Sequence, residues 1–309
     1  MAANIQKSLQ DKLCAGHFVI TAEVTPPVST DRGELLAKAL PLKGLADAVN
    51  VTDGAGARPH LGAVTAAAML VEAGIEPILQ LTCRDRNRIA LQGDLLSAAA
   101  SGVRNLLMLR GDDPSAGDQP DAKPVFDLDP RSLLATARRL RDTGELPSGR
   151  KVTGRADFFL GGADNPIDPE PGWEPKGLQA KIDAGAQFVQ TQFCMDAGVV
   201  RRYMARLDQH DFTSKLSMII GIVPLRSAKS ARWIKEKLFG ATIPDALIAR
   251  MQAASDPAAE GRRICLDLVA ELAAIPQVAG VHIMAPGNES AVPEIIKAAR
   301  ESISRLAPA

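Results

Sequence analysis

The chain has 309 residues, of which 46% are hydrophobic and 23% charged, a composition typical of a soluble globular protein. Its 36 basic residues balance its 36 acidic ones and only 4% of residues are aromatic, so no nucleic-acid surface or anionic-membrane surface is expected. No apolar run approaches the ~20 residues of a membrane span, the N-terminus lacks a signal core, and the four cysteines form no CxxC pair, which favours a cytoplasmic protein.

Short β-branched runs alternate with helical patterns along the chain. The runs that predict strands are 18–24, 47–52, 77–82, 104–109, 151–157, 187–191, 216–223 and 278–284. The helical patterns lie at 32–44, 60–74, 86–102, 130–144, 174–185, 197–210, 227 to about 275, and 291–306. This alternation predicts one domain over residues 1–309, a (β/α)₈ TIM barrel. A doubly wound open sheet is the competing fold, but its glycine-rich first turn is absent from "EVTPP".

Polar side chains gather where the predicted strands end, which is the side of such a barrel that carries active sites. They include Glu23, Thr52, Gln80, Arg110, Asp112, Asn165, Gln190 and Gln192. A carboxyl group at the end of an apolar strand suits a general acid, although Glu23 taken alone is also compatible with an ordinary loop carboxylate. Cys83 fits a packing role better than a nucleophile, and the four histidines show no metal-binding spacing, so no metal site is expected.

An ordered set of motifs resembles the methylenetetrahydrofolate reductase family over 18–306. The motifs are "AEVTPP", "VNVTDGA", "LQLTCRDRN", "LRGDDP", "KIDAGAQFVQTQFCMD", "GIVPL" and "GVHIM". The resemblance implies a flavin-dependent barrel that reduces 5,10-methylenetetrahydrofolate to 5-methyltetrahydrofolate in one-carbon metabolism and methionine supply. It also implies FAD, rather than FMN, as the cofactor that passes a hydride to the folate, with NAD(P)H often the electron donor.

The same resemblance assigns roles to individual residues. Glu23 matches the general acid that protonates a folate nitrogen, and Asp112 matches the acid between flavin and pterin that binds folate and tunes the flavin. Gln192 matches a folate-binding amide. The positions that match flavin contacts are Thr52, Gln80, Arg110, Gly111, Asn165, Glu174 and Lys181.

Several positions depart from the family pattern. Gln80 stands where many bacterial members have a histidine, Ala228 where NADH-using members have an aromatic residue, and Glu289 where they have an arginine. The tyrosine expected over the flavin aligns with the glycines of "LGGAD". These changes favour a member that uses NADH poorly and takes electrons from another donor or a partner protein.

Two other functions stay open from the sequence. One is a pterin-binding barrel of methyltransferase type that works without flavin, and the other is a non-catalytic subunit of a flavin or folate complex. A homo-oligomer is the default expectation for a soluble enzyme.

Overall fold

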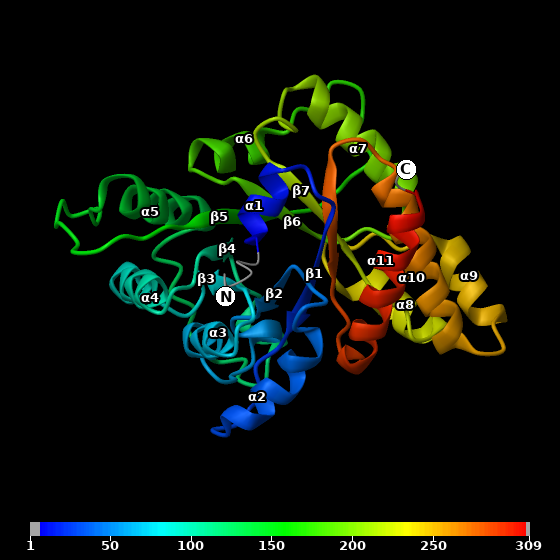
Figure 1. The fold of residues 1–309 in the computed structure, drawn as a ribbon, viewed down its shortest axis with the longest axis horizontal. Helices are drawn as coiled ribbons and strands as arrows, with labels where there is room; N and C mark the ends of the chain where they lie inside the picture. The colour runs from blue at the N-terminus through cyan, green and yellow to red at the C-terminus, as the bar shows by residue number, and fades with distance from the viewer. Residues whose placement is uncertain (1–6, 307–309) are drawn as a thin grey trace, which may run out of the picture.

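The computed structural model describes residues 7–306. Within them, eight parallel strands form a closed barrel in which each strand pairs with the next and β8 pairs with β1 (Figure 1). The strands are β1 (Val19–Val24), β2 (Ala48–Val51), β3 (Pro77–Thr82), β4 (Asn105–Leu109), β5 (Phe159–Asp164), β6 (Phe188–Phe193), β7 (Ser217–Ile222) and β8 (Val278–Ile283). The predicted TIM barrel is therefore confirmed.

Helices surround the barrel and connect its strands (Figure 1). They are α2 (Arg32–Ala39), α3 (Ala63–Glu72), α4 (Arg88–Ala100), α5 (Pro130–Thr143), α6 (Lys176–Asp183), α7 (Ala197–Gln209), α8 (Ala228–Lys237), α9 (Asp245–Ala253), α10 (Pro257–Ala273) and α11 (Val292–Leu306). Helix α5 shows why they form: Asp129 caps its start by accepting from Ser132 N, and Gly144 ends it in a left-handed conformation. Its buried stripe includes Leu133, Ala137 and Leu140, which face the sheet.

An additional helix, α1 (Leu9–Cys14), closes the N-terminal end of the barrel and was not expected from the sequence (Figure 1). Ser8 and Asp11 form a capping box at its start. Leu9 and Leu13 pack into the apolar cluster inside the barrel, and the Leu9 amide donates to the Glu76 carboxylate at 2.9 Å, directly before β3. The opposite end of the barrel is thereby left as the side where a site can form.

The barrel interior changes from apolar to polar along the strands. Side chains two residues apart point the same way, so Val19, Thr21 and Glu23 of β1 succeed one another up the interior. The lower layer is apolar and contains Val19, Ala48, Ile78, Leu107, Phe159, Phe188 and Ile219. The layer above it is polar and buried, with Thr21, Asn50, Gln80, Gln190 and His282. Polar groups are thus concentrated below the C-terminal rim.

The fifth strand lies later in the chain than predicted. Residues 151–157 contain only an isolated bridge between Lys151 and Glu145, whereas β5 is Phe159–Asp164 and includes two glycines. The ring of Phe188 on β6 occupies the space that a side chain at Gly161 would need, and it stacks on Phe159 with centroids 4.8 Å apart. A neighbouring aromatic residue therefore fills the barrel where the strand itself lacks side chains.

Candidate functional site

Glu23 lies near the C-terminal end of β1 with its side chain 20% exposed. Its Oε2 accepts a hydrogen bond from Gln80 Nε2 on β3 at 3.0 Å. The same oxygen lies 3.7 Å from Nε2 of His282 on β8, a residue that is only 3% exposed. Two nitrogen atoms, one from β3 and one from the adjacent strand β8, thus approach one oxygen of a carboxyl group that still reaches solvent. This arrangement suits a group that exchanges a proton with a bound ligand.

A buried hydrogen-bond network lies directly beneath Glu23. Asn50 and Gln190 pair through their amides, and Gln190 Nε2 also contacts Thr21 Oγ1 at 3.1 Å. Thr21 Oγ1 lies 2.9 Å from Nδ1 of His282. His282 was not among the predicted site residues, because the spacing of the four histidines indicates no metal site and does not distinguish His282 among them. The inward alternation along β8 was the signal that could have identified it.

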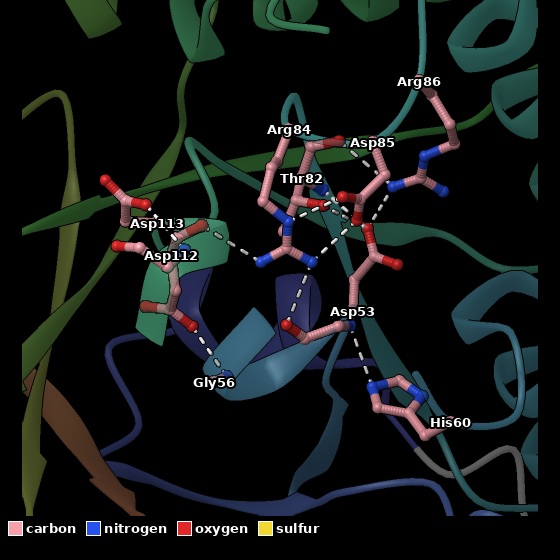
Figure 2. Close-up of polar contacts among 11 residues, drawn as sticks. Asp53, Gly56, His60, Thr82, Arg84, Asp85, Arg86, Asp112 and Asp113 are labelled. Carbon is pink, nitrogen blue, oxygen red and sulfur yellow. Dashed lines mark hydrogen bonds and ion pairs between the residues drawn. The ribbon is translucent and has the colours of Figure 1, made fainter. Parts of the chain in front are cut away.

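Asp112 follows β4 and is held at the rim by the loop after β2. Its Oδ2 accepts from the Gly56 amide at 2.8 Å, and its backbone oxygen accepts from Arg84 Nη1 at 3.3 Å (Figure 2). The side chain is otherwise exposed. The carboxylate is therefore fixed in place by backbone contacts while it faces solvent.

Arg84 ties the ends of β2, β3 and β4 together (Figure 2). Its guanidinium is 4% exposed and forms a bidentate pair with Asp85, both distances being 2.7 Å, and the Asp85 partner raises the pKa of Arg84 above its usual value. Nearby, Asp53 accepts from both Thr82 N and Thr82 Oγ1 and pairs with Arg86. Because Arg84 and Arg86 form ion pairs with acidic residues of the protein, the segment "RDRN" has a structural role at the rim of the barrel.

The residues expected to hold flavin lie along the ends of β2, β4 and β5. Thr52 directly follows β2, and its buried Oγ1 has no hydrogen-bond partner within residues 7–306. Arg110 follows β4, with its guanidinium carbon 4.4 Å from the centre of the Phe126 ring. Gly111 has a φ of 93°, and a side chain there would meet Arg84 and Thr82 rather than open space.

The other expected flavin contacts lie around β5 and α6. Lys181 Nζ is 3.1 Å from Asp164 Oδ1 at the end of β5, and Tyr203 donates to the other oxygen of Asp164. Asn165 packs against Gly240, where a side chain would overlap its amide. Glu174 precedes α6, is exposed, and pairs only loosely with Lys176 at 3.3 Å. The rim thus offers cations and an unpaired hydroxyl, which fit the phosphates and polar groups of a flavin nucleotide.

Sequence reasoning also missed the segment that covers Asn165. Residues 239–242 run beside the end of β6, where Thr242 N donates to Phe193 O at 2.8 Å and Met195 N donates to Thr242 O at 2.9 Å. Gly240 within this segment has a φ of 79°, a left-handed conformation that favours glycine. The segment therefore extends the rim above β5 and β6.

Gln192 lies at an irregularity of β6. The pairing between β6 and β7 shifts between Gln190 and Phe193, and Gln192 Oε1 accepts from the Phe193 amide at 3.0 Å. Gln190, which the sequence placed on the same face, lies lower in the buried network. The Gln192 side chain is half-buried, and its amide nitrogen remains available to a ligand at the rim.

A cavity of about 420 Å³ opens between the ends of β7 and β8 and helix α8. Its lining is mainly apolar, with Leu225, Trp233 and Ile234 among the residues, and Arg226 and Lys229 supply positive charge. Trp233 is 56% exposed. The cavity is thus suited to an aromatic group that carries negative charge.

The buried cysteines fit a packing role. Cys83 is fully buried at the end of β3, and desolvation raises its pKa to about 11. A thiol with this pKa is not a nucleophile near neutral pH.

No helix within residues 7–306 is both long and apolar enough to cross a bilayer. The same residues contain no group of three or more His, Cys, Asp or Glu side chains that is arranged to hold a metal ion.

Comparisons with known proteins show which sequences and folds this chain is similar to. A probable methylenetetrahydrofolate reductase (NADPH) from Caenorhabditis elegans is 27% identical over 75% of this chain and 33% of its own length. A 5,10-methylenetetrahydrofolate reductase from Pectobacterium carotovorum is 29% identical over 74% of this chain and 72% of its own. A Schizosaccharomyces pombe methylenetetrahydrofolate reductase 2 matches at 27% identity over 58% of this chain and 28% of its own, so the chain spans about a third of these eukaryotic relatives.

Among solved structures, an uncharacterized protein from Clostridium thermocellum that binds two copies of 5-methyl-5,6,7,8-tetrahydrofolic acid shares the fold. The TM-score is 0.64 at 16% identity, covering 95% of this chain and 98% of that one. The family model for methylenetetrahydrofolate reductase matches residues 8–300. The chain therefore belongs to the methylenetetrahydrofolate reductase family.

Proposed function

We propose that this protein reduces 5,10-methylenetetrahydrofolate to 5-methyltetrahydrofolate with a bound flavin, FAD. The proposal rests on the position and the contacts of Glu23. It is a carboxyl group at the C-terminal end of a barrel strand, with nitrogen atoms of two neighbouring side chains directed at one oxygen and the other oxygen left for a ligand. Family membership makes the folate the natural ligand for that oxygen.

Glu23 acts as the general acid in this proposal. It donates its proton to a nitrogen of the methylene bridge, the carbon–nitrogen bond breaks, and an electrophilic iminium forms on the folate. Because the iminium is cationic, the carboxylates of Glu23 and Asp112 stabilise it as it forms. The hydride that completes the methyl group is what a reduced flavin supplies when bound.

The chain's own residues support flavin binding by their chemistry. The unpaired Thr52 hydroxyl is buried beside the interior, where it can bond a polar atom of the isoalloxazine ring. Arg110 and Lys181 place positive charge at the ends of neighbouring strands, where the phosphates are expected. Asn165, Glu174 and Gly111 complete the proposed contacts. Gln80 is more closely tied to Glu23 than to this group.

The cavity between β7, β8 and α8 is proposed to receive the p-aminobenzoyl-glutamate tail of the folate. Trp233 provides an aromatic surface, and Arg226 and Lys229 provide charge for carboxylates. Ala228 and Glu289 stand where the family pattern has an aromatic residue and an arginine, so the proposed tail contacts come from these other residues. Gln192 is proposed to bind the pterin end through its free amide nitrogen.

The electron donor is proposed to be something other than free NADH, such as a partner protein. The absence of an aromatic side chain at Ala228 removes a surface on which a nicotinamide ring would stack. Tight, saturable oxidation of NADH by the purified protein alone would contradict this part of the proposal.

The decisive experiment isolates the folate step. The purified protein is loaded with FAD, photoreduced without oxygen, and mixed with 5,10-methylenetetrahydrofolate. We expect the oxidised flavin absorption to return and methyltetrahydrofolate to form in equal amount. Glu23→Gln should bind flavin normally and lose this reaction, because the amide cannot donate an acidic proton.

Two outcomes would contradict the proposal. A flavin that stays reduced in the wild-type protein would mean that folate reduction is wrong. A protein that binds no FAD but still transfers a methyl group from a methylated folate would favour a flavin-free methyltransferase.

A further inference from the structure

We propose that Tyr203 is a positioning residue for Lys181: its hydroxyl holds the Asp164 carboxylate, and that carboxylate holds the Lys181 ammonium at the rim, where the ammonium binds a phosphate of the cofactor. The identity of this phosphate as one of FAD rests on the proposed function. The hold of Tyr203 on Lys181 does not, and it can be tested without any cofactor.

The three side chains come from three different elements. Asp164 ends β5, Lys181 lies on α6 and Tyr203 lies on α7. Lys181 Nζ is 3.1 Å from Asp164 Oδ1, and the Tyr203 hydroxyl donates to Asp164 Oδ2. Each oxygen of the carboxylate therefore has its own partner, and Asp164 is the group through which Tyr203 influences Lys181.

Burial determines that Tyr203 is the donor in this contact. The side chain is only 1% exposed, and desolvation raises the pKa of its hydroxyl, with the charge of Asp164 raising it further. Tyr203 therefore keeps its proton near neutral pH and directs it at the carboxylate. A hydrogen bond to an ionised acceptor is stronger than one between neutral groups, so the Asp164 carboxylate is held firmly.

The Tyr203 ring is fixed by its own neighbours. The ring of Trp173 packs against it with centroids 5.8 Å apart and a tilt of 49°. Arg206, three residues later on α7, donates from Nε and Nη2 to the Trp173 carbonyl at 3.1 and 2.9 Å. These contacts join α7 to the segment before α6, so the tyrosine is a rigid point from which Asp164 can be oriented.

The Lys181 stem follows β5 toward the rim. A side chain at Gly162 would lie 3.3 Å from Lys181 Cδ, so the stem runs across this glycine and the ammonium reaches the end of the strand. An ammonium has three N–H donors, and Asp164 is its hydrogen-bond partner within residues 7–306. The Tyr203 bond shares the negative charge of Asp164, so the carboxylate orients Lys181 and leaves part of its positive charge for a phosphate.

The first test is carbon NMR of the protein labelled with ¹³C at the hydroxyl-bearing carbon of tyrosine. The sequence has one tyrosine, so the spectrum has one such signal, from Tyr203. We expect Lys181→Met to move this signal, because Asp164 without its cation accepts more strongly from the hydroxyl. Lys176→Met is the matched control and should leave the signal in place, since Lys176 is 85% exposed and pairs with Glu174. An unmoved signal in Lys181→Met would overturn the proposal.

The second test is a double-mutant cycle on FAD affinity. Tyr203→Phe removes the hydroxyl and retains the ring that packs against Trp173. We expect it to weaken FAD binding about three- to tenfold, the effect of one hydrogen bond, and to leave riboflavin binding nearly unchanged. Lys181→Met should weaken FAD binding about tenfold. The double variant should also lose only about tenfold, because the two substitutions remove the same interaction.

A role of Tyr203 in folding alone gives a different result. The two losses would then multiply to about 30- to 100-fold in the double variant, or Tyr203→Phe would weaken the binding of FAD and riboflavin equally. Either result would overturn the proposal. If the wild-type protein binds no FAD at all, the proposed function fails instead, and the NMR comparison alone decides whether Tyr203 is coupled to Lys181.

Discussion

Gly54 and Arg84 interlock at the rim of the barrel: the Gly54 carbonyl accepts from Arg84 Nη2 at 3.1 Å, and a side chain on Gly54 would overlap the same nitrogen. Gly54 also has a φ of 62°, which L-residues rarely adopt. Since Arg84 in turn bonds the backbone of Asp112, this contact joins the loop after β2 to the loop after β4. The position of a proposed catalytic carboxylate thus depends on a glycine two strands away.

We expect Gly54→Ala to destabilise the protein more than Gly56→Ala. Both glycines have nearly the same φ, 62° and 63°, but a side chain at Gly56 meets nothing within 4 Å in the described part of the chain. Left-handed strain costs roughly 1–2 kcal/mol in either variant, and displacing Arg84 adds about 1–3 kcal/mol in Gly54→Ala. Urea unfolding measures the difference. Equal losses of stability would show that Arg84 adapts freely.

Because Gln80 contacts Glu23, we expect substitution of Gln80 to slow the reaction without weakening FAD binding. Removing the amide in Gln80→Ala should slow the folate half-reaction about tenfold, as expected for one hydrogen bond to a charged group. The dissociation constant for FAD should change less than about threefold, because the Gln80 amide is directed at Glu23. Flavin titration and rapid mixing measure the two effects. Weaker FAD binding with an unchanged rate would instead assign Gln80 to the cofactor, as the family pattern implies.

Most of the fold follows from patterns that are local in sequence. Seven of the eight predicted strand ranges overlap strands of the barrel. They could be predicted because a buried parallel strand appears in the sequence as a short β-branched run between two helical patterns. The prediction for 151–157 was wrong: Val152 and Thr153 are the only β-branched residues in this range, and it forms only the isolated bridge between Lys151 and Glu145. The true fifth strand contains Gly161 and Gly162, and its interior is filled by Phe188, which lies far along the chain. A contact of that kind leaves no local pattern.

The rim was easier to predict than the interior. Glu23, Thr52 and Asp112 follow from the rule that strand ends carry the site, and the structure places them there. The bonds from Gln80 and the approach of His282 depend on side chains from β3 and β8 converging on β1. Only the closed barrel brings these strands together, so residue types alone could not indicate which polar groups are partners.

Burial of three cysteines predicts a single rapidly reacting thiol. Cys14 is exposed, whereas Cys83, Cys194 and Cys265 are buried, and desolvation raises their pKa values to about 11, about 11 and about 12. Because the thiolate is the reactive form, a disulfide reagent at pH 8 should modify one thiol quickly and the others only after unfolding. Cys14→Ser should remove the fast phase. A second fast thiol in that variant would contradict the burial.

The same shifts predict loss of stability at alkaline pH. A thiol whose pKa is higher in the folded protein than in the unfolded chain favours folding fully below the unfolded value, near 9.0, and loses that contribution as the pH rises toward 11 and 12. Urea midpoints should therefore fall above pH 9 and fall less in Cys265→Ala relative to that variant's own neutral-pH value. An identical alkaline decline in the variant would show that other groups control it.

Two lysines of α6 provide a matched test of the proposed flavin site. Lys181 is 19% exposed and lies 3.1 Å from Asp164 at the end of β5, whereas Lys176 is 85% exposed and pairs with Glu174 outside the barrel. We expect Lys181→Met to weaken FAD binding about tenfold, because it removes a cation from the proposed phosphate position. Lys176→Met should change FAD affinity by less than about twofold, since an exposed ion pair contributes little.

The measurement is a titration of the flavin-free protein with FAD and, separately, with riboflavin, which has no phosphate. If Lys181 contacts a phosphate, its substitution should weaken the binding of FAD and leave that of riboflavin nearly unchanged. Loss of both affinities together would mean that Lys181 supports the site through Asp164 and Tyr203, whose hydroxyl bonds the same carboxylate. Tyr203→Phe then distinguishes the two cases, because it perturbs Asp164 while retaining the Lys181 cation.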